Sequence, residues 1–183
     1  DRVGPGSDIV ARRMASLAKL ALTTRKHPTI VLTTVNAIVQ RVPARSFMKR
    51  TIKALAPGQR VDMARLTQRL ALMGYTRSGT VMEQGEYAVR GGIVDVFPMG
   101  APAPYRIDLF GEKVETIRLF DPESQRSGEK LPGVRLLPAR EVPLQPEAIQ
   151  RFRQAFRTRF EGDPQKVALY REVSKGSGPA GIE

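Results

Sequence analysis

The 183-residue sequence contains no cysteine and no tryptophan, and it contains a single histidine. The lack of cysteine excludes disulfide bonds and thiolate metal sites, and one histidine is too few for a histidine-rich metal centre. Aromatic residues make up only 6% of the chain. No stretch interleaves aromatic and basic residues in the way that base-stacking surfaces for nucleic acids do.

The sequence also lacks long hydrophobic runs. No stretch approaches the roughly 18 to 20 uncharged apolar residues that a membrane-spanning helix needs, and no secretion signal is recognisable at the start. Hydrophobic residues make up 41% of the chain and charged residues 26%, a balance typical of globular domains. We therefore expect a soluble, folded, cytoplasmic protein that does not bind membranes.

Acidic residues are few compared with basic ones. The chain has 18 Asp and Glu against 30 Lys and Arg, which gives a formal net charge of +12. An excess of this size suggests an acidic partner, and nucleic acid is the first candidate. The positive charge is spread over several segments, which weighs against a single binding patch. A basic nucleic-acid-binding module remains the alternative function.

No arrangement of residues predicts catalysis. The sequence has no Gly-x-x-x-x-Gly-Lys-Ser/Thr loop to hold nucleotide phosphates. Asp95 and Asp108 have no nucleophile or general base near them in the sequence motifs, so we expect hydrogen-bonded or surface carboxylates. We predict no catalytic, cofactor-binding or metal-binding residues, and we do not expect this chain to be an enzyme.

Two stretches, residues 87–98 and 105–120, are dense in β-branched and aromatic residues that recur at period two. Gly, Pro and Asp lie at their ends, which predicts two or three antiparallel strands. From residue 105 to 110 the alternation places three apolar side chains in a core and three others on the opposite, solvent face: Arg106, Asp108 and Phe110. An arginine beside a large aromatic ring is typical of a protein-binding hot spot, although an ordinary solvated face would have the same composition.

The register of the hairpin between the last two strands has two alternatives. A two-residue loop would place Asp108 opposite Glu115, a like-charged pair, whereas a three-residue loop would place it opposite Thr116. We favour the longer loop, which pairs Ile107 with Ile117 but leaves Glu115 on the apolar side.

Helices are predicted before the strands. Asp8 is a candidate N-cap of a helix that ends near Leu22, and Asp62 is a candidate N-cap of a helix that ends at Gly74. The second helix carries an apolar stripe that should cover the apolar face of the sheet. A helix packed on an antiparallel sheet predicts a two-layer α+β architecture.

The flanking segments have different patterns. Residues 29–34 are a continuous apolar run, which predicts a buried strand, and a short helix should follow over residues 35–42. One strand and one helix are too little of a parallel α/β sheet to stand alone, so we expect the chain to be part of a longer protein. Residues 147–160 predict a helix with a phenylalanine stripe and four arginines, which either contacts DNA or is a solvated face.

Several motifs, taken in order, resemble one known family. They are Arg90-Gly91, Ile-Val-Asp-Val-Phe-Pro98, Arg106-Ile-Asp-Leu-Phe-Gly-Glu112, Ile117-Arg118 and Phe120-Asp121-Pro122. The series is similar to the UvrA-binding domain shared by UvrB and the bacterial transcription-repair coupling factor family (Mfd). Gln125-Arg126-Ser127 and the segment from residue 173 to 183 resemble the coupling factors and not UvrB. The resemblance extends from about Asp8 to Glu183.

The resemblance implies a non-catalytic adaptor that recruits UvrA and so links stalled transcription to nucleotide excision repair. It implies UvrA contacts at four matching positions: Arg90, Arg106, Asp108 and Phe110. It also implies that the full-length protein is an ATP-dependent DNA translocase, which uses ATP and magnesium and binds RNA polymerase and double-stranded DNA through other domains.

The same resemblance divides the chain into three parts. Residues 1–50 would be the C-terminal part of a UvrB-like, helicase-like α/β domain. Residues 51–137 would be the UvrA-binding α+β domain, and residues 138–183 a mainly helical segment that returns to the UvrB-like domain.

Overall fold

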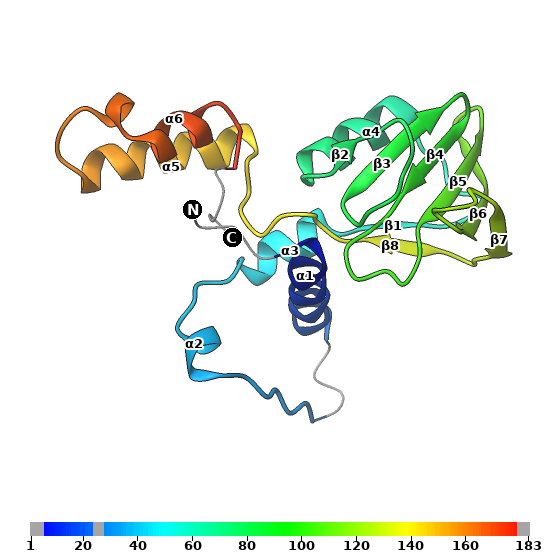
Figure 1. The fold of residues 1–183 in the computed structure, drawn as a ribbon, viewed down its shortest axis with the longest axis horizontal. Coiled ribbons are helices and arrows are strands. Elements are labelled where there is room, and N and C mark those ends of the chain that lie inside the picture. Colours follow the sequence, from blue (N-terminus) through cyan, green and yellow to red (C-terminus); the bar gives the residue numbers. More distant parts are fainter. Residues whose placement is uncertain (1–5, 24–27, 179–183) are drawn as a thin grey trace.

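A computed structural model describes residues 6–23 and 28–178, and Figure 1 shows the fold. The helices are α1 (Ser7–Leu22), α2 (Val35–Ile38), α3 (Arg45–Thr51), α4 (Met63–Leu72), α5 (Pro146–Arg159), the 3-10 turn η1 (Pro164–Lys166) and α6 (Ala168–Ser174). The strands are β1 (Lys53–Leu55), β2 (Thr76–Arg77), β3 (Glu86–Arg90), β4 (Ile93–Val96), β5 (Tyr105–Phe110), β6 (Lys113–Phe120), β7 (Ser127–Lys130) and β8 (Val134–Leu136). No helix within the described ranges combines the length and the hydrophobicity needed to cross a bilayer.

The main sheet has six strands in the order β2-β3-β4-β5-β6-β7. Its strands pair antiparallel except for the short β2, which pairs parallel to β3. A separate antiparallel pair, β1 with β8, joins the two ends of this region. Helix α4 lies against the sheet in Figure 1, and its buried Leu66 and Leu70 share one core with Val94 and Ile107. The predicted α+β architecture is confirmed.

Helix α4 forms where the local signals predicted it. The side chain of Asp62 accepts a hydrogen bond from the Arg65 backbone N–H (Oδ1 to N, 2.7 Å), which confirms the predicted N-cap. Gly74 has φ +93°, a backbone conformation that glycine adopts without steric cost, and the helix ends just before it. The N-cap, the buried apolar stripe and the glycine that ends the helix are all local signals of this one segment.

Replacing Asp62 with alanine is expected to lower the free energy of unfolding by about 1 kcal/mol, because the N–H of Arg65 loses its acceptor. Urea denaturation followed by circular dichroism would measure the change. Asp62→Asn is the matched control, since asparagine keeps the capping oxygen and should retain most of the stability. An equal loss in both variants would mean that the charge of Asp62, and not its cap, is what stabilises the helix.

The β5–β6 hairpin combines features of both predicted registers. Ile107 pairs with Ile117 and Asp108 with Thr116, so the favoured pairing is confirmed. The three-residue loop is wrong, because Phe110 pairs with Lys113 across a two-residue turn. The pairing shifts by one residue beside Asp108, which makes Glu115 an extra residue in β6, a β-bulge. The bulge turns Glu115 to solvent instead of the apolar side.

Helix α1 contributes to the core of the sheet region. Met14, Ala11 and Ala18 are buried in the same cluster as the inward residues of β4, β5 and β6. The loop that joins β4 to β5 lies close against this helix, since a Cβ built on Gly100 would come within 2.6 Å of the Ala15 Cβ. Gly100 also has φ +74°, so both its conformation and its surroundings favour glycine.

The predicted N-cap of α1 is wrong. Gly6 occupies the cap position, and Asp8 lies in the first turn, where its carboxylate pairs with the Arg12 guanidinium one turn later (2.5 Å). A carboxylate in this position is still favourable, because it interacts with the N-terminal end of the helix dipole and with a basic residue at i+4.

The predicted buried strand over residues 29–34 is also wrong. This segment has no regular structure in the described chain, and the side chain of Leu32 is 92% exposed. A buried strand needs neighbouring strands to satisfy its backbone hydrogen bonds, and no described strand pairs with this segment. The helix predicted after it is shorter than expected and covers only Val35–Ile38.

The predicted helix over residues 147–160 forms as α5, which packs against α6 apart from the sheet (Figure 1). The ring of Phe156 lies 5.6 Å from that of Phe152 and 5.1 Å from that of Tyr170, so the phenylalanine stripe packs on α6. The Arg157 Nε donates a hydrogen bond to the Tyr170 hydroxyl (2.9 Å). The α5 arginines are exposed, as both alternatives for this helix require, a DNA contact or a solvated face.

Candidate protein-docking face

The side of the main sheet that faces away from the main core is called the outer face here, and it is defined by Arg90, Asp95, Arg106, Asp108 and Phe110. Strand pairing sets their neighbours: Asp95 lies opposite Arg106, and Asp108 lies opposite Ile93, which itself pairs with Arg90. The inward neighbours along β5, Ile107 and Leu109, are buried in the main core. The four predicted contact residues therefore lie on one face. The period-two alternation predicted this for Arg106, Asp108 and Phe110, whereas Arg90 was implied by the resemblance alone.

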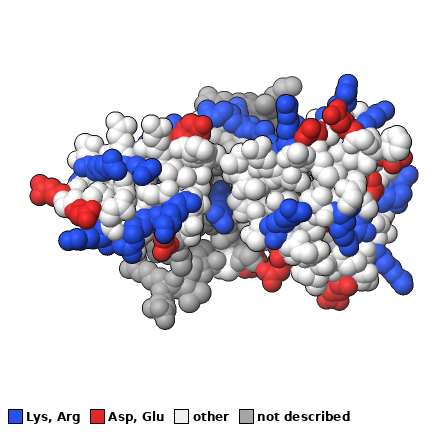
Figure 2. Space-filling view, turned by 90° about the horizontal axis from the view of Figure 1, so that it is seen from above, with Lys and Arg blue, Asp and Glu red and all other residues white. Residues whose placement is uncertain are grey.

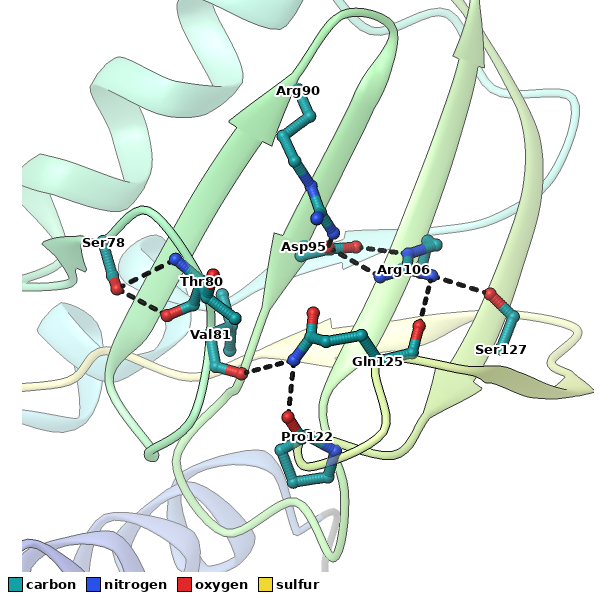
Figure 3. Close-up of polar contacts among 9 residues, drawn as sticks. All are labelled: Ser78, Thr80, Val81, Arg90, Asp95, Arg106, Pro122, Gln125 and Ser127. Atoms are coloured by element: carbon teal, nitrogen blue, oxygen red, sulfur yellow. Dashed lines mark hydrogen bonds and ion pairs between the residues drawn. The ribbon is translucent and has the colours of Figure 1, made fainter.

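Asp95 is the centre of this face. Asp95 is only 1% exposed, and its carboxylate accepts hydrogen bonds from two arginines (Figure 3). Arg106 binds it with two nitrogens, Nε to Oδ1 at 2.8 Å and Nη2 to Oδ2 at 2.9 Å. Arg90 binds Oδ2 through Nη2 at 2.5 Å. A buried carboxylate is costly without partners, and two guanidinium groups supply the compensating charge and hydrogen bonds.

Arg106 differs from its predicted exposure, since only 13% of its side chain is accessible to solvent. Its Nη1 donates to the Gln125 carbonyl oxygen and to the Ser127 hydroxyl, both at 3.0 Å, and its guanidinium carbon lies 4.6 Å from the centre of the Phe120 ring. Hydrogen bonding to Asp95 raises the pKa of Arg106 above its usual value, so the side chain stays charged. The alternation identified the correct face, but the segment that covers Arg106 is far away in the sequence.

A second, smaller core lies over one end of the outer face. It consists of Val81, Ala88 and Phe120, with the partly buried Phe97 packed against them. The segment around Val81 folds back over the sheet to form it, and Gln125 in the turn before β7 is hydrogen-bonded to that segment (Figure 3). The outer face therefore has a covered end around Arg106 and an open end around Phe110.

The open end presents an apolar ring beside fixed polar groups. Phe110 is 80% exposed, and the Arg90 side chain is 48% exposed although Asp95 holds its guanidinium. Asp108 is half-buried and accepts a hydrogen bond from the Thr116 hydroxyl at 2.5 Å. A partner could bury this exposed aromatic ring while ordering few side chains, because the arginine and the carboxylate on the same face are already held in place.

Charge is dispersed over the side of the molecule that Figure 2 shows. On the side shown in Figure 2, basic side chains are spread over both the helical end and the sheet end, with acidic ones among them. This distribution differs from the single basic stripe that is typical of a nucleic-acid groove. Within the described ranges, no three His, Cys, Asp or Glu side chains gather where they could hold a metal ion.

Sequence reasoning missed three members of this cluster. Asp95 was predicted to be either hydrogen-bonded or at the surface, and its burial between two arginines was not predicted. Its place opposite Arg106 could have been inferred from a correct β4–β5 register. Gln125 and Ser127 were noted only as part of the resemblance to the coupling factors. Nothing local indicated their contacts with Arg106, which depend on how the turn before β7 folds back.

Comparison with known proteins gives a consistent result. The family model described as the UvrB interaction domain matches residues 54–142. Over 183 residues, the whole of this chain, the sequence is 39% identical to the transcription-repair-coupling factor of Escherichia coli (strain K12). It is 39% identical over 157 residues, 86% of the chain, to the protein of the same name from Myxococcus xanthus. The chain spans 16% of the length of the first relative and 13% of the second.

Proposed function

The chain is homologous to a segment of the transcription-repair coupling factors and carries a UvrB interaction domain at residues 54–142, and from this premise we propose that it is a non-catalytic adaptor that binds UvrA. UvrA is the partner implied by the resemblance in residues 90–122. Recruiting UvrA would connect a stalled transcription complex to nucleotide excision repair.

One observation supports this proposal above the others: the outer face exposes the Phe110 ring, at 80%, and the same face carries the half-exposed Arg90. Protein interfaces concentrate their binding free energy in aromatic and arginine side chains that a partner desolvates. Phe110 would be the apolar anchor, Arg90 would contact an acidic or carbonyl group on UvrA, and Asp108 would lie at the rim.

Arg106 has a different role in this proposal from that of Phe110. Its guanidinium is covered and bonded to Asp95, so it would act mainly by holding Asp95 and, through it, Arg90. Arg106→Ala would leave the buried carboxylate with one partner fewer. Weaker UvrA binding by that variant could therefore reflect a disturbed fold as well as a lost contact.

The whole protein would supply the activities that this chain does not carry. We propose that other domains bind RNA polymerase and double-stranded DNA in the cytoplasm and use ATP and magnesium for translocation. Direct nucleic-acid binding by the present chain is the second candidate, favoured by its net charge of +12 and by the exposed arginines of α5.

Purified UvrA is expected to bind this chain directly, and Arg90→Ala should weaken that binding about tenfold, because interface arginines commonly contribute more than ~1 kcal/mol. Isothermal titration calorimetry would measure the affinity. The matched control is Arg65→Ala, which removes an exposed positive charge from α4, on the other side of the sheet.

A duplex DNA titration separates the two candidate functions. A nucleic-acid-binding module should lose affinity steeply as salt rises, in proportion to the phosphates that it contacts. UvrA binding that is unaffected by Arg90→Ala, together with tight and salt-dependent DNA binding, would favour the second candidate. Equal losses in Arg90→Ala and Arg65→Ala would point to general charge attraction without a defined contact.

A further inference from the structure

We propose that Gln125 is a positioning residue of the outer face, which fixes Arg106 and, through Asp95, sets the place of Arg90 (Figure 3). This inference rests on the proposed function, since it concerns the arrangement of groups that UvrA would meet. Gln125 lies in the turn between β6 and β7 and contributes in two ways, through its backbone and through its side-chain amide.

The backbone of Gln125 presents an acceptor to Arg106. Gln125 has φ +60° and is the one non-glycine residue with positive φ in the described part of the chain. Its carbonyl oxygen accepts a hydrogen bond from the Arg106 Nη1 at 3.0 Å, and its N–H donates to the Asp121 carbonyl oxygen at 2.8 Å. The left-handed conformation is uncommon for a residue with a side chain and usually persists only where surrounding contacts enforce it.

The side chain of Gln125 supplies those contacts. Its Nε2 donates to the Pro122 carbonyl oxygen at 2.6 Å and to the Val81 carbonyl oxygen at 3.3 Å. The opposite amide orientation would place Oε1 against two carbonyl oxygens, so these partners determine which end is the nitrogen. The amide therefore links its own turn to the segment around Val81, and both segments cover the same end of the outer face.

Two features of Gln125 are unfavourable for stability. One is the left-handed backbone, and the other is the side-chain Oε1, which is buried and receives no hydrogen bond from the described residues. A residue needed only to fill space would require neither. Such features concentrate where a defined geometry serves function, which favours a positioning role.

The contacts form one continuous path. The Gln125 carbonyl oxygen binds Arg106 Nη1, and the other Arg106 nitrogens bind both oxygens of Asp95. Asp95 Oδ2 also accepts from the half-exposed Arg90. If the turn moves away, Arg106 loses its hydrogen bond to the Gln125 carbonyl oxygen. Arg106 would then hold the Asp95 carboxylate less firmly, and the position of Arg90 on that carboxylate would become less defined.

The proposal can be tested with Gln125→Ala and Gln125→Gly. Each removes the side-chain amide, and glycine also relieves the backbone strain, so at least the glycine variant should fold. UvrA affinity should fall about tenfold in both, the scale on which losing one buried hydrogen-bonding group acts. Gln154→Ala is the matched control, because it makes the same chemical change at an exposed position on α5.

Side-chain nitrogen NMR of the free chain provides a readout that UvrA binding does not affect. The Arg106 Nε–H should exchange slowly with water in the wild type and faster in both Gln125 variants. A purely structural role would lower the melting temperature but leave both the affinity at low temperature and the Arg106 signal unchanged, and that result would overturn the proposal. If the wild type fails to bind UvrA, the proposed function fails, and the Arg106 signal still decides whether Gln125 positions this arginine.

Discussion

Phe110→Ala is expected to weaken UvrA binding by about 30-fold or more, because truncating an interface hot spot costs about 2 kcal/mol or more. The ring is 80% exposed in the free chain, so a partner that covers it would bury a large apolar surface. The same exposure means that the free energy of unfolding should change by less than about 0.5 kcal/mol. Calorimetric titration with UvrA and urea denaturation would measure the two quantities.

Phe160→Ala is the matched control for this prediction. Phe160 is also an exposed aromatic residue, at 55%, but it lies at the end of α5, apart from the outer face. Its removal should leave UvrA affinity unchanged. If Phe110→Ala binds UvrA with wild-type affinity, Phe110 is not the anchor and the proposed docking mode is wrong. Equal losses of affinity in both variants would show that the effect is not local to the outer face.

Asp95→Ala has the largest expected effect on stability. Removing one partner of a buried ion pair typically lowers the free energy of unfolding by about 3–5 kcal/mol, because the opposite charge is left without compensation. Arg106 would be left in that state, since only 13% of its side chain reaches solvent. Arg90 would be affected less, because water can replace Asp95 around its half-exposed guanidinium. Urea denaturation would measure the loss.

Asp108→Ala tests whether burial explains the size of that loss. Asp108 is an acidic residue on the same face, but it is half-buried and its carboxylate accepts one hydrogen bond, from Thr116. Its removal should cost only about 1 kcal/mol, the usual net contribution of a single hydrogen bond. Similar losses in the two variants would mean that Asp95 is not the centre of the cluster.

These two predictions determine which substitution is informative about function. Phe110→Ala changes the proposed contact while leaving the fold intact, whereas changes at Asp95 or Arg106 alter the internal support of the face. Loss of UvrA binding at Phe110 with unchanged stability would therefore be the most direct support for the docking mode.

The sequence predicted those features that depend on neighbouring residues. For α4, the cap at Asp62 and the stop at Gly74 act within one helix, so a short stretch contained the whole signal. The inward and outward positions of β5 follow from strand geometry, which is also local. The pairing of Ile107 with Ile117 was correct because apolar and polar residues must each match across a hairpin.

Features that depend on distant segments could not be predicted. The bulge at Glu115 allows the hairpin to combine a two-residue turn with the pairing of Ile107 and Ile117. Neither of the two predicted registers contained a bulge. Arg106 is covered because residues near 81 and 125 fold over it, and no local pattern indicates that return. The apolar run at residues 29–34 shows the converse error, since its composition is that of a strand but no described strand pairs with it.

The packing of α1 constrains how the docking face can move. Met14 is fully buried among the residues beneath the outer face, and Gly100 allows the β4–β5 loop to lie directly against Ala15. Because Met14 packs in the same core as Ile107 and Leu109, a rotation of α1 against the sheet would disturb the packing beneath the strand that carries Phe110. Part of the core beneath the outer face is thus supplied by a helix upstream of residue 54, outside the segment that matches the interaction-domain family.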